Sequence, residues 1–334
     1  MRINRETLLN IANDTVAQRT RRERGLLSAY LCGSLLGDDY LLGGTADIDL
    51  VFIHMDAFPA SREIVRLTDD VHLDIAHYFE KDFRETRKLR LHAWIGPALS
   101  SCRLLYDPQH FLDFTRASVG GQFDRPDNVL GRAQPQLAHA RQIWSGLAEG
   151  PPARTETEQV AAYLRAVEHA ANAVASLSGG PLTERRFLLS FPERAVAVGR
   201  PGLHAGLLGI LGAPKVAPES LHAWLGDWLT GFDSLPADQA PARLQPFRRS
   251  YYHKAFLAMV EGDQPQAVLW PLLRTWTLVA GHLTAGQPAM LAWENACRQL
   301  ELLGAGFEGR LNALDAFLDM VEETLEAWGR ENGV

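Results

Sequence analysis

Two aspartates stand at the start of an apolar segment that a Gly-Ser pair precedes. The aspartates are Asp47 and Asp49, and the pair is Gly33 and Ser34. Successive side chains of a β-strand point to opposite faces, so both aspartates point one way and the apolar residues between and after them point the other way. Two adjacent carboxylates beside a Gly-Ser turn suit a divalent metal ion that carries a triphosphate, because such ions prefer hard oxygen ligands. We therefore expect a metal and nucleotide site here.

A third acidic residue, Asp74, lies in a later segment in which apolar and polar residues alternate. Residues 71–79 are expected to form a strand with Val71 and Leu73 on one face and Asp74 on the other. A third carboxylate on a neighbouring strand would extend the acidic site. An aspartate on the exposed face of an edge strand shows the same pattern. In that case the expected fold would be the same, but the protein would lack a catalytic residue.

Taken in order, Gly33-Ser34, Asp47, Asp49 and Asp74 match the motifs of the polymerase-β-like nucleotidyltransferases. The first third of the chain resembles this superfamily, and within it the small bacterial enzymes of the aminoglycoside nucleotidyltransferase type. The resemblance implies an enzyme that transfers a nucleoside monophosphate from a magnesium-bound nucleoside triphosphate, with ATP as the expected donor, to an acceptor hydroxyl and releases pyrophosphate. It also implies two Mg²⁺ ions, with Asp47 and Asp49 bridging both and Asp74 completing the site of the ion that activates the acceptor.

Several residues are candidates for contact with the nucleotide. Gly33 has no side chain and lets the backbone approach the triphosphate, and Ser34 and Thr45 add hydroxyl groups. Tyr251 could stack on the base while Lys254 meets the triphosphate, because the two residues lie close together after a basic stretch. Aromatic and basic residues at this helical spacing also pack against neighbouring elements, and that alternative is open.

In enzymes of this kind a carboxylate from the helical domain often deprotonates the acceptor, and Glu168 is the candidate here. It lies at the border of the apolar face of an expected helix over residues 156–178. A glutamate at such a border more often lies at the solvent edge. A catalytic role and a purely structural one therefore both stay open.

Hydrophobic periodicity predicts two domains of different fold. Strand and helix patterns alternate up to residue 106, and helical patterns alone follow after about residue 108. We expect an α+β protein, with a small mixed-sheet nucleotidyltransferase domain at 1–120 and an all-α domain for the acceptor or a partner at 121–334. The expected strands are 26–32, 48–54, 71–79 and 102–106. The expected helices are 5–22, 61–70, 80–93, 128–148, 156–178, 218–231, 240–262, 265–283, 286–302 and 308–330.

Composition places the chain among ordinary globular proteins. Of its 334 residues 46% are hydrophobic and 22% are charged, and the formal net charge is −7, whereas a nucleic-acid coat protein is usually basic. The three cysteines lie far apart, without the spacing of a zinc site or a disulfide framework. The N-terminal residues lack the apolar segment of a secretory signal, and the most apolar later stretch, 267–280, is too short and interrupted to span a membrane. We expect a cytoplasmic protein with no membrane partner.

The acceptor is the least determined part of this hypothesis. A net negative charge suits a cationic small molecule of the aminoglycoside type, since a negative cleft concentrates cations. Nucleotidylation of an RNA end or of a protein is an alternative, although the sequence lacks the long basic stripe with interleaved aromatic residues that is typical of RNA binding. A further alternative is a catalytically inactive module that binds a nucleotide or a partner. The sequence leaves the oligomeric state open.

Overall fold

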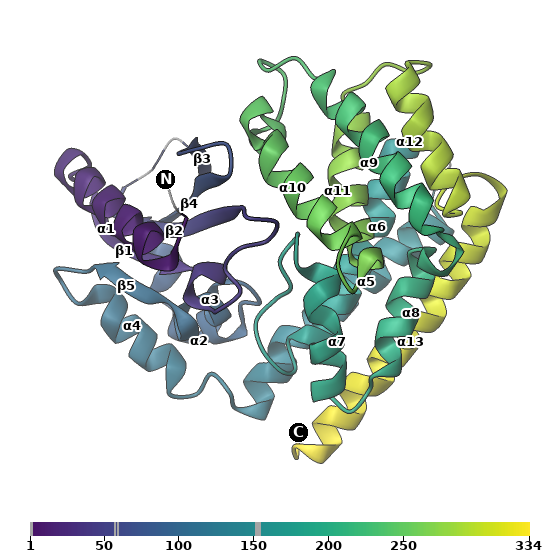
Figure 1. Cartoon of the computed structure of the whole chain (residues 1–334). Helices are drawn as coiled ribbons and strands as arrows, with labels where there is room; N and C mark the ends of the chain where they lie inside the picture. Colours follow the sequence, from purple (N-terminus) through teal and green to yellow (C-terminus); the bar gives the residue numbers. More distant parts are fainter. Residues whose placement is uncertain (1–2, 57, 59, 151–154) are drawn as a thin grey trace. The chain divides into compact units, whose positions relative to one another are not determined.

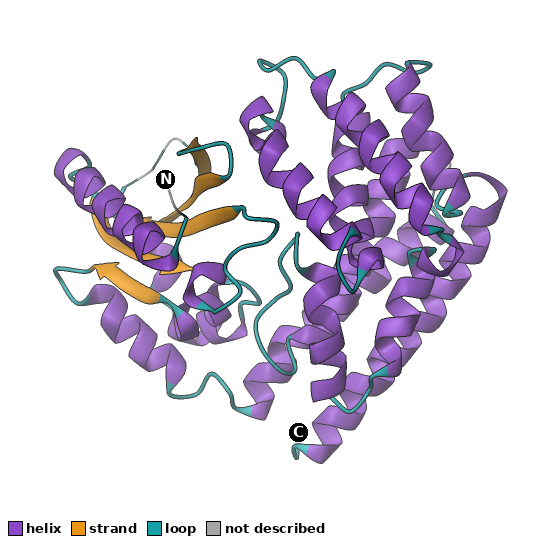
Figure 2. Ribbon diagram, in the orientation of Figure 1, coloured by secondary structure: helices purple, strands orange, loops and turns teal. Residues whose placement is uncertain are grey.

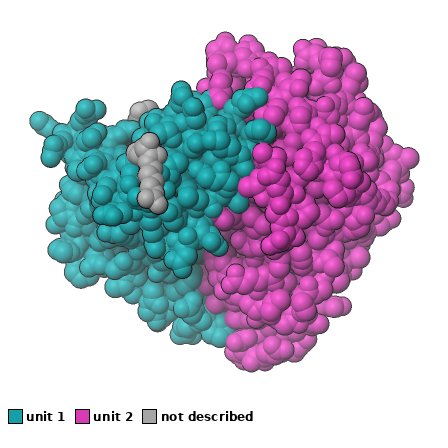
Figure 3. Space-filling model, in the orientation of Figure 1, with its two compact units in different colours: residues 1–128, 247–255 teal, residues 129–246, 256–334 magenta. Residues whose placement is uncertain are grey.

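The chain folds into two compact units, shown in different colours in Figure 3. The computed structural model describes residues 3–56, 58, 60–150 and 155–334. The first unit comprises Met1–Asn128 and Phe247–Ala255, and the second comprises Val129–Pro246 and Phe256–Val334. A short segment from the C-terminal half of the chain therefore belongs to the N-terminal unit.

A five-stranded mixed sheet is the centre of the first unit (Figure 1; Figure 2). Its strands lie in the order β3-β4-β2-β1-β5, and they are β1 (Leu26–Cys32), β2 (Ala46–His54), β3 (Arg62–Arg66), β4 (Val71–Phe79) and β5 (Arg103–Tyr106). β2 and β4 run parallel, and the other neighbouring pairs run antiparallel. The expected α+β class with a mixed sheet is confirmed.

Helices cover both faces of this sheet. α1 (Arg5–Arg22) packs on the face that carries Ile48, and three later helices pack on the face that carries Val51. Because side chains alternate along a strand, Asp47 and Asp49 lie on the Val51 face, at the end where β2 begins. The three helices on that face are α2 (Thr86–Leu91), α3 (Ile95–Ser101) and α4 (Phe111–Gly120).

One predicted helix of the first unit is a strand. The segment 61–70, expected to be helical, contains β3 (Arg62–Arg66), which pairs antiparallel with β4. The β-branched residues Ile64 and Val65 favour an extended backbone, and the edge of β4 supplies the hydrogen bonds. The prediction was wrong because that edge comes from tertiary structure, which the local pattern does not reveal.

The other regular elements of the described residues are helices. Among them α7 and α8 were not predicted, and neither were α3 and α4 of the first unit. α7 and α8 form where only Gly/Pro-rich breaks were expected. The helix expected over 240–262 begins at Arg249, because two short 3-10 helices come before it, one capped by Pro241 and one that starts at Pro246. The helices are α5 (Pro126–Ala148), α6 (Glu156–Ala175), α7 (Phe187–Ala197), α8 (Gly202–Ile210), α9 (Pro218–Asp233), α10 (Arg249–Val260), α11 (Leu269–Ala280), α12 (Pro288–Gln299) and α13 (Phe307–Glu331). The 3-10 helices are η1 (Ser34–Leu36), η2 (Glu80–Phe83), η3 (Ala213–Lys215), η4 (Ala242–Leu244), η5 (Pro246–Arg248), η6 (Pro265–Val268) and η7 (Gly304–Gly306).

Within the described residues, no helix combines the length and the apolar character that crossing a membrane requires.

Replacement of Ile48 by alanine should destabilise the first unit. Ile48 is completely buried between the sheet and α1, so the substitution removes apolar contacts and leaves a cavity. We expect the free energy of unfolding to fall by about 2–5 kcal/mol, measured by urea denaturation. Leu67→Ala is the control, because Leu67 is 36% exposed, and it should change the free energy by no more than about 0.5 kcal/mol. Equal effects of the two substitutions would contradict this description of the core.

Candidate active site

The carboxylate of Asp49 lies directly against the backbone of Gly33, which follows the end of β1. Gly33 has a φ of 78°, in the left-handed region that favours glycine. A Cβ atom at this position would lie 2.0 Å from Oδ2 of Asp49, far inside van der Waals contact. A short 3-10 helix then begins at Ser34, whose side chain is half-buried. The Gly-Ser turn is thus in direct contact with the strand that carries Asp47 and Asp49.

The register of the parallel pair β2–β4 brings the second and third aspartates together. Asp49 is paired with Asp74, and on the other side of β2 it is paired with Cys32 of β1. Burial, and then the negative charge of Asp49, raise the pKa of the Cys32 thiol far above its usual value. The thiolate form of Cys32 is therefore disfavoured.

The side chain of Arg62, on β3, forms an ion pair with the carboxylate of Asp74. Its Nε and Nη2 atoms donate to the two carboxylate oxygens at 2.5 Å each, in a bidentate arrangement. The hydrogen bond to Asp74 is the main reason that the pKa of Arg62 is raised. The Asp74 side chain is 7% exposed and that of Arg62 is 46% exposed, so the arginine covers the carboxylate from the solvent side.

Asp47 is held by two residues of the segment Phe247–Ala255. Arg248 donates from Nη1 and Nη2 to the two carboxylate oxygens at 2.6 and 3.1 Å, and the Tyr251 hydroxyl donates to the same carboxylate. The guanidinium also lies 3.7 Å from the centre of the Tyr251 ring. Burial is the largest single influence and opposes the charge of Arg248, but Asp47, Tyr251 and Tyr252 together outweigh it and raise the pKa of the guanidinium.

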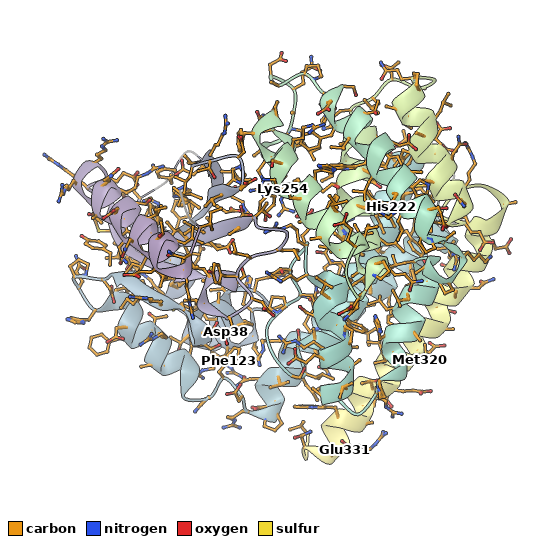
Figure 4. All side chains as sticks on the ribbon, in the orientation of Figure 1. Asp38, Phe123, His222, Lys254, Met320 and Glu331 are labelled. Atoms are coloured by element: carbon orange, nitrogen blue, oxygen red, sulfur yellow. The ribbon has the colours of Figure 1, made fainter. Side chains whose placement is uncertain are left out.

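The other residues expected to contact the nucleotide make internal contacts. The Thr45 hydroxyl donates to the Leu42 carbonyl at 2.8 Å and lies 3.3 Å from the Tyr251 carbonyl oxygen. Lys254, labelled on α10 in Figure 4, donates from Nζ to Oδ2 of Asp70 at 2.7 Å. Thr45, Tyr251 and Lys254 thus attach the segment Phe247–Ala255 to the sheet, and their contact with a nucleotide stays a prediction.

Glu168 lies on α6 in the second unit. Nη1 of Arg274 donates to its Oε2 at 2.7 Å, and the Glu168 side chain is 23% exposed. Burial raises the pKa of this carboxyl above its usual value, against the opposing effect of Arg274. A raised pKa is compatible with a general base, and this role of Glu168 stays a prediction.

The three aspartates are of the residue type that binds magnesium. Their carboxylates are not arranged to bind a metal ion together. Carboxylate oxygens are the ligands that Mg²⁺ prefers. However, Asp47 and Asp74 each hold a guanidinium through both oxygens. Among the described residues no group of three or more His, Cys, Asp and Glu side chains could hold a metal ion. The residues therefore do not fit a metal site as they stand.

Sequence reasoning missed the two arginines. Arg62 was assigned to a helix that is in fact β3. Arg248 belongs to the basic stretch before Tyr251, and its partner Asp47 lies 201 positions earlier in the chain. A local pattern contains no signal for either pairing, since both depend on which strands and segments become neighbours.

Comparison with known proteins assigns no family. No protein-family model matches the chain, and no curated protein matches it. Among solved structures, a nucleotidyltransferase-like protein from Exiguobacterium sibiricum 255-15 is similar, with 12% sequence identity over 94% of this chain and 91% of that chain. The TM-score is 0.30, and a likeness of this degree carries no argument about function. The resemblance to nucleotidyltransferases thus rests on the motif residues themselves.

Replacement of Gly33 by alanine should destabilise the protein more than replacement of Gly44. Both glycines have positive φ, so alanine introduces backbone strain at either position. Only at Gly33 does the new methyl group collide with Asp49, because nothing lies within 4 Å of a Cβ at Gly44. We expect Gly33→Ala to lower the free energy of unfolding by about 1–3 kcal/mol more than Gly44→Ala, measured by urea denaturation. Equal losses would show that the contact between Gly33 and Asp49 is not tight.

Proposed function

We propose that this protein is a nucleotidyltransferase that binds a nucleoside triphosphate, with ATP as the expected donor, in its first unit. The observation that supports this most is the pairing of Asp49 with Asp74 on adjacent parallel strands, with the Gly33 backbone against Asp49. A backbone without a side chain beside two carboxylates allows a phosphate chain and its counter-ions to approach closely. Of the sequence motifs, these are the ones that the fold brings together.

In the proposed reaction an acceptor oxygen forms a bond to the α-phosphorus of the nucleotide. The bond from that phosphorus to the bridging oxygen breaks, and pyrophosphate leaves with the electron pair. The acceptor proton passes to a base, for which Glu168 is the candidate. Mg²⁺, when bound, supplies charge neutralisation for the phosphate oxygens. Asp47, Asp49 and Asp74 are its proposed ligands, and the pairs with Arg248 and Arg62 would have to open first.

The proposed acceptor is a cationic small molecule of the aminoglycoside type. The formal net charge of −7 supports this choice, because a negatively charged surface raises the local concentration of cations. An RNA end or a protein hydroxyl is the alternative acceptor. Pyrophosphate release that depends on tRNA or on a protein, and not on aminoglycosides, would identify it.

One observation favours a second candidate function, a module that binds a nucleotide or a partner without turnover. The carboxylates of Asp47 and Asp74 already have guanidinium partners. If these pairs never open, the fold can still present the Gly33 turn to an anion. Binding of a triphosphate without pyrophosphate release, with every acceptor class tested, would support this candidate.

Removal of the Asp49 charge should weaken magnesium-dependent nucleotide binding. Asp49→Asn retains the size of the side chain and its position against Gly33. We expect calorimetry with ATP, GTP, CTP and UTP to show binding that requires Mg²⁺ in the wild type and is weaker by about tenfold or more in the variant. Asp69→Asn is the control, because Asp69 is an exposed carboxylate paired with Arg66 outside the site. If no triphosphate binds to the wild type, the proposed function is wrong.

Replacement of Glu168 by glutamine should slow turnover without changing nucleotide affinity. A general base contributes about 10²–10⁴-fold to the rate. It acts only when deprotonated, so activity should fall as the pH is lowered through the pKa of Glu168, which burial has moved to higher pH. The pH–rate profile of Glu168→Gln should lack this acid limb. Glu294→Gln, which alters another shielded carboxylate paired with an arginine, is the control, and an unchanged rate in Glu168→Gln would exclude the role.

A further inference from the structure

Arg248 and Arg62 occupy the carboxylate oxygens that a divalent cation would need. Each arginine forms two hydrogen bonds to one carboxylate, Arg248 to Asp47 and Arg62 to Asp74. A bidentate guanidinium engages both oxygens of its partner. From this geometry we infer that the two arginines compete with divalent cations, so that a metal ion binds only by ion-pair exchange. Only the part of this inference that concerns ATP rests on the proposed function.

The two arginines differ in how readily they can leave. The Arg62 side chain is 46% exposed, so its guanidinium can turn into solvent at small cost. The Arg248 side chain is 4% exposed, lies on the Tyr251 ring and shares Asp47 with the Tyr251 hydroxyl. Removing Asp47 from this guanidinium would leave a buried charge without compensation. Arg248 is therefore the main barrier to a cation at this site.

The segment that carries Arg248 is anchored to the sheet of the first unit. Asp70, at the start of β4, accepts hydrogen bonds from the Ser250 hydroxyl at 2.9 Å and from Lys254. The His72 ring lies 3.2 Å from the carbonyl oxygen of Phe247. A Cβ atom at Gly43 would lie 2.2 Å from the Lys254 carbonyl oxygen, so the backbone itself is in close contact. Arg248 is thus held in place from several sides.

A metal ion alone and a metal ion with a triphosphate should behave differently. A metal ion alone would take Asp47 and leave the Arg248 guanidinium without an anion. A magnesium-bound triphosphate would supply both charges, a cation for the carboxylates and anionic oxygens for the arginines. Metal and nucleotide should therefore bind cooperatively, and by linkage each should raise the affinity of the other by the same factor.

The test measures Mn²⁺ binding by electron paramagnetic resonance, first without nucleotide and then with ATP. Arg248→Gln should bind Mn²⁺ about 10-fold to 100-fold more tightly than the wild type without nucleotide, because a charged hydrogen-bonded partner no longer competes. ATP should raise Mn²⁺ affinity more in the wild type than in this variant. A merely structural role of Arg248 would not produce tighter metal binding, since general damage weakens a site.

Two further variants keep the test decisive if Arg248→Gln folds poorly. Tyr251→Phe keeps the ion pair but removes one hydrogen bond to Asp47. Arg62→Gln removes the guanidinium that holds the Asp74 carboxylate. Each variant should tighten Mn²⁺ binding by a smaller factor than Arg248→Gln. Arg66→Gln, which alters an exposed pair with Asp69, should have no effect. Equal Mn²⁺ affinity in the wild type and all folded variants would overturn the inference. Tighter binding by the variants, with no ATP binding by any protein, would support the competition and overturn the proposed function.

Discussion

The parallel pairing of β2 with β4 is the constraint on which the first unit depends. In-register pairing from Ala46 and Val71 onward buries Ile48 and Leu73 on one face of the sheet. The same register places the acidic residues of both strands on the opposite face. A shift of one residue would turn the apolar side chains of a strand to the wrong face, so core and site cannot vary independently. The position of Asp49 opposite Asp74 is therefore secured by hydrophobic burial.

The arginine partners show how the fold accommodates a concentration of negative charge. Carboxylates removed from water are costly unless they are paired and hydrogen-bonded. Asp47, which is mostly buried, has a buried arginine and a tyrosine hydroxyl, whereas Asp74 has an arginine that remains half in solvent. Both carboxylates are mostly buried, and the two pairings differ in how far the arginine itself is removed from solvent. Two arginines of the protein thus compensate the charges of Asp47 and Asp74.

The helical unit contributes a different kind of feature. Glu168 is on α6, most of whose residues are buried, and its carboxylate is paired with Arg274 of α11. Desolvation and the arginine act on its pKa in opposite directions, and desolvation is the larger effect. This balance leaves a carboxylate that is held in one orientation but is more basic than an exposed glutamate. The helix that carries Glu168 is long and periodic, which is why its position could be predicted.

The sequence by itself determined the elements whose apolar pattern is long or regular. These include α1, β1, β2, β4 and α6, and with them the shared face of Asp47 and Asp49. Only the tertiary structure decided that residues 62–66 form an edge strand and that residues 247–255 join the first unit. Both depend on hydrogen bonds and ion pairs between distant segments, such as Asp47 with Arg248. Local periodicity reports which side of an element is buried, but it does not report the partner that buries it.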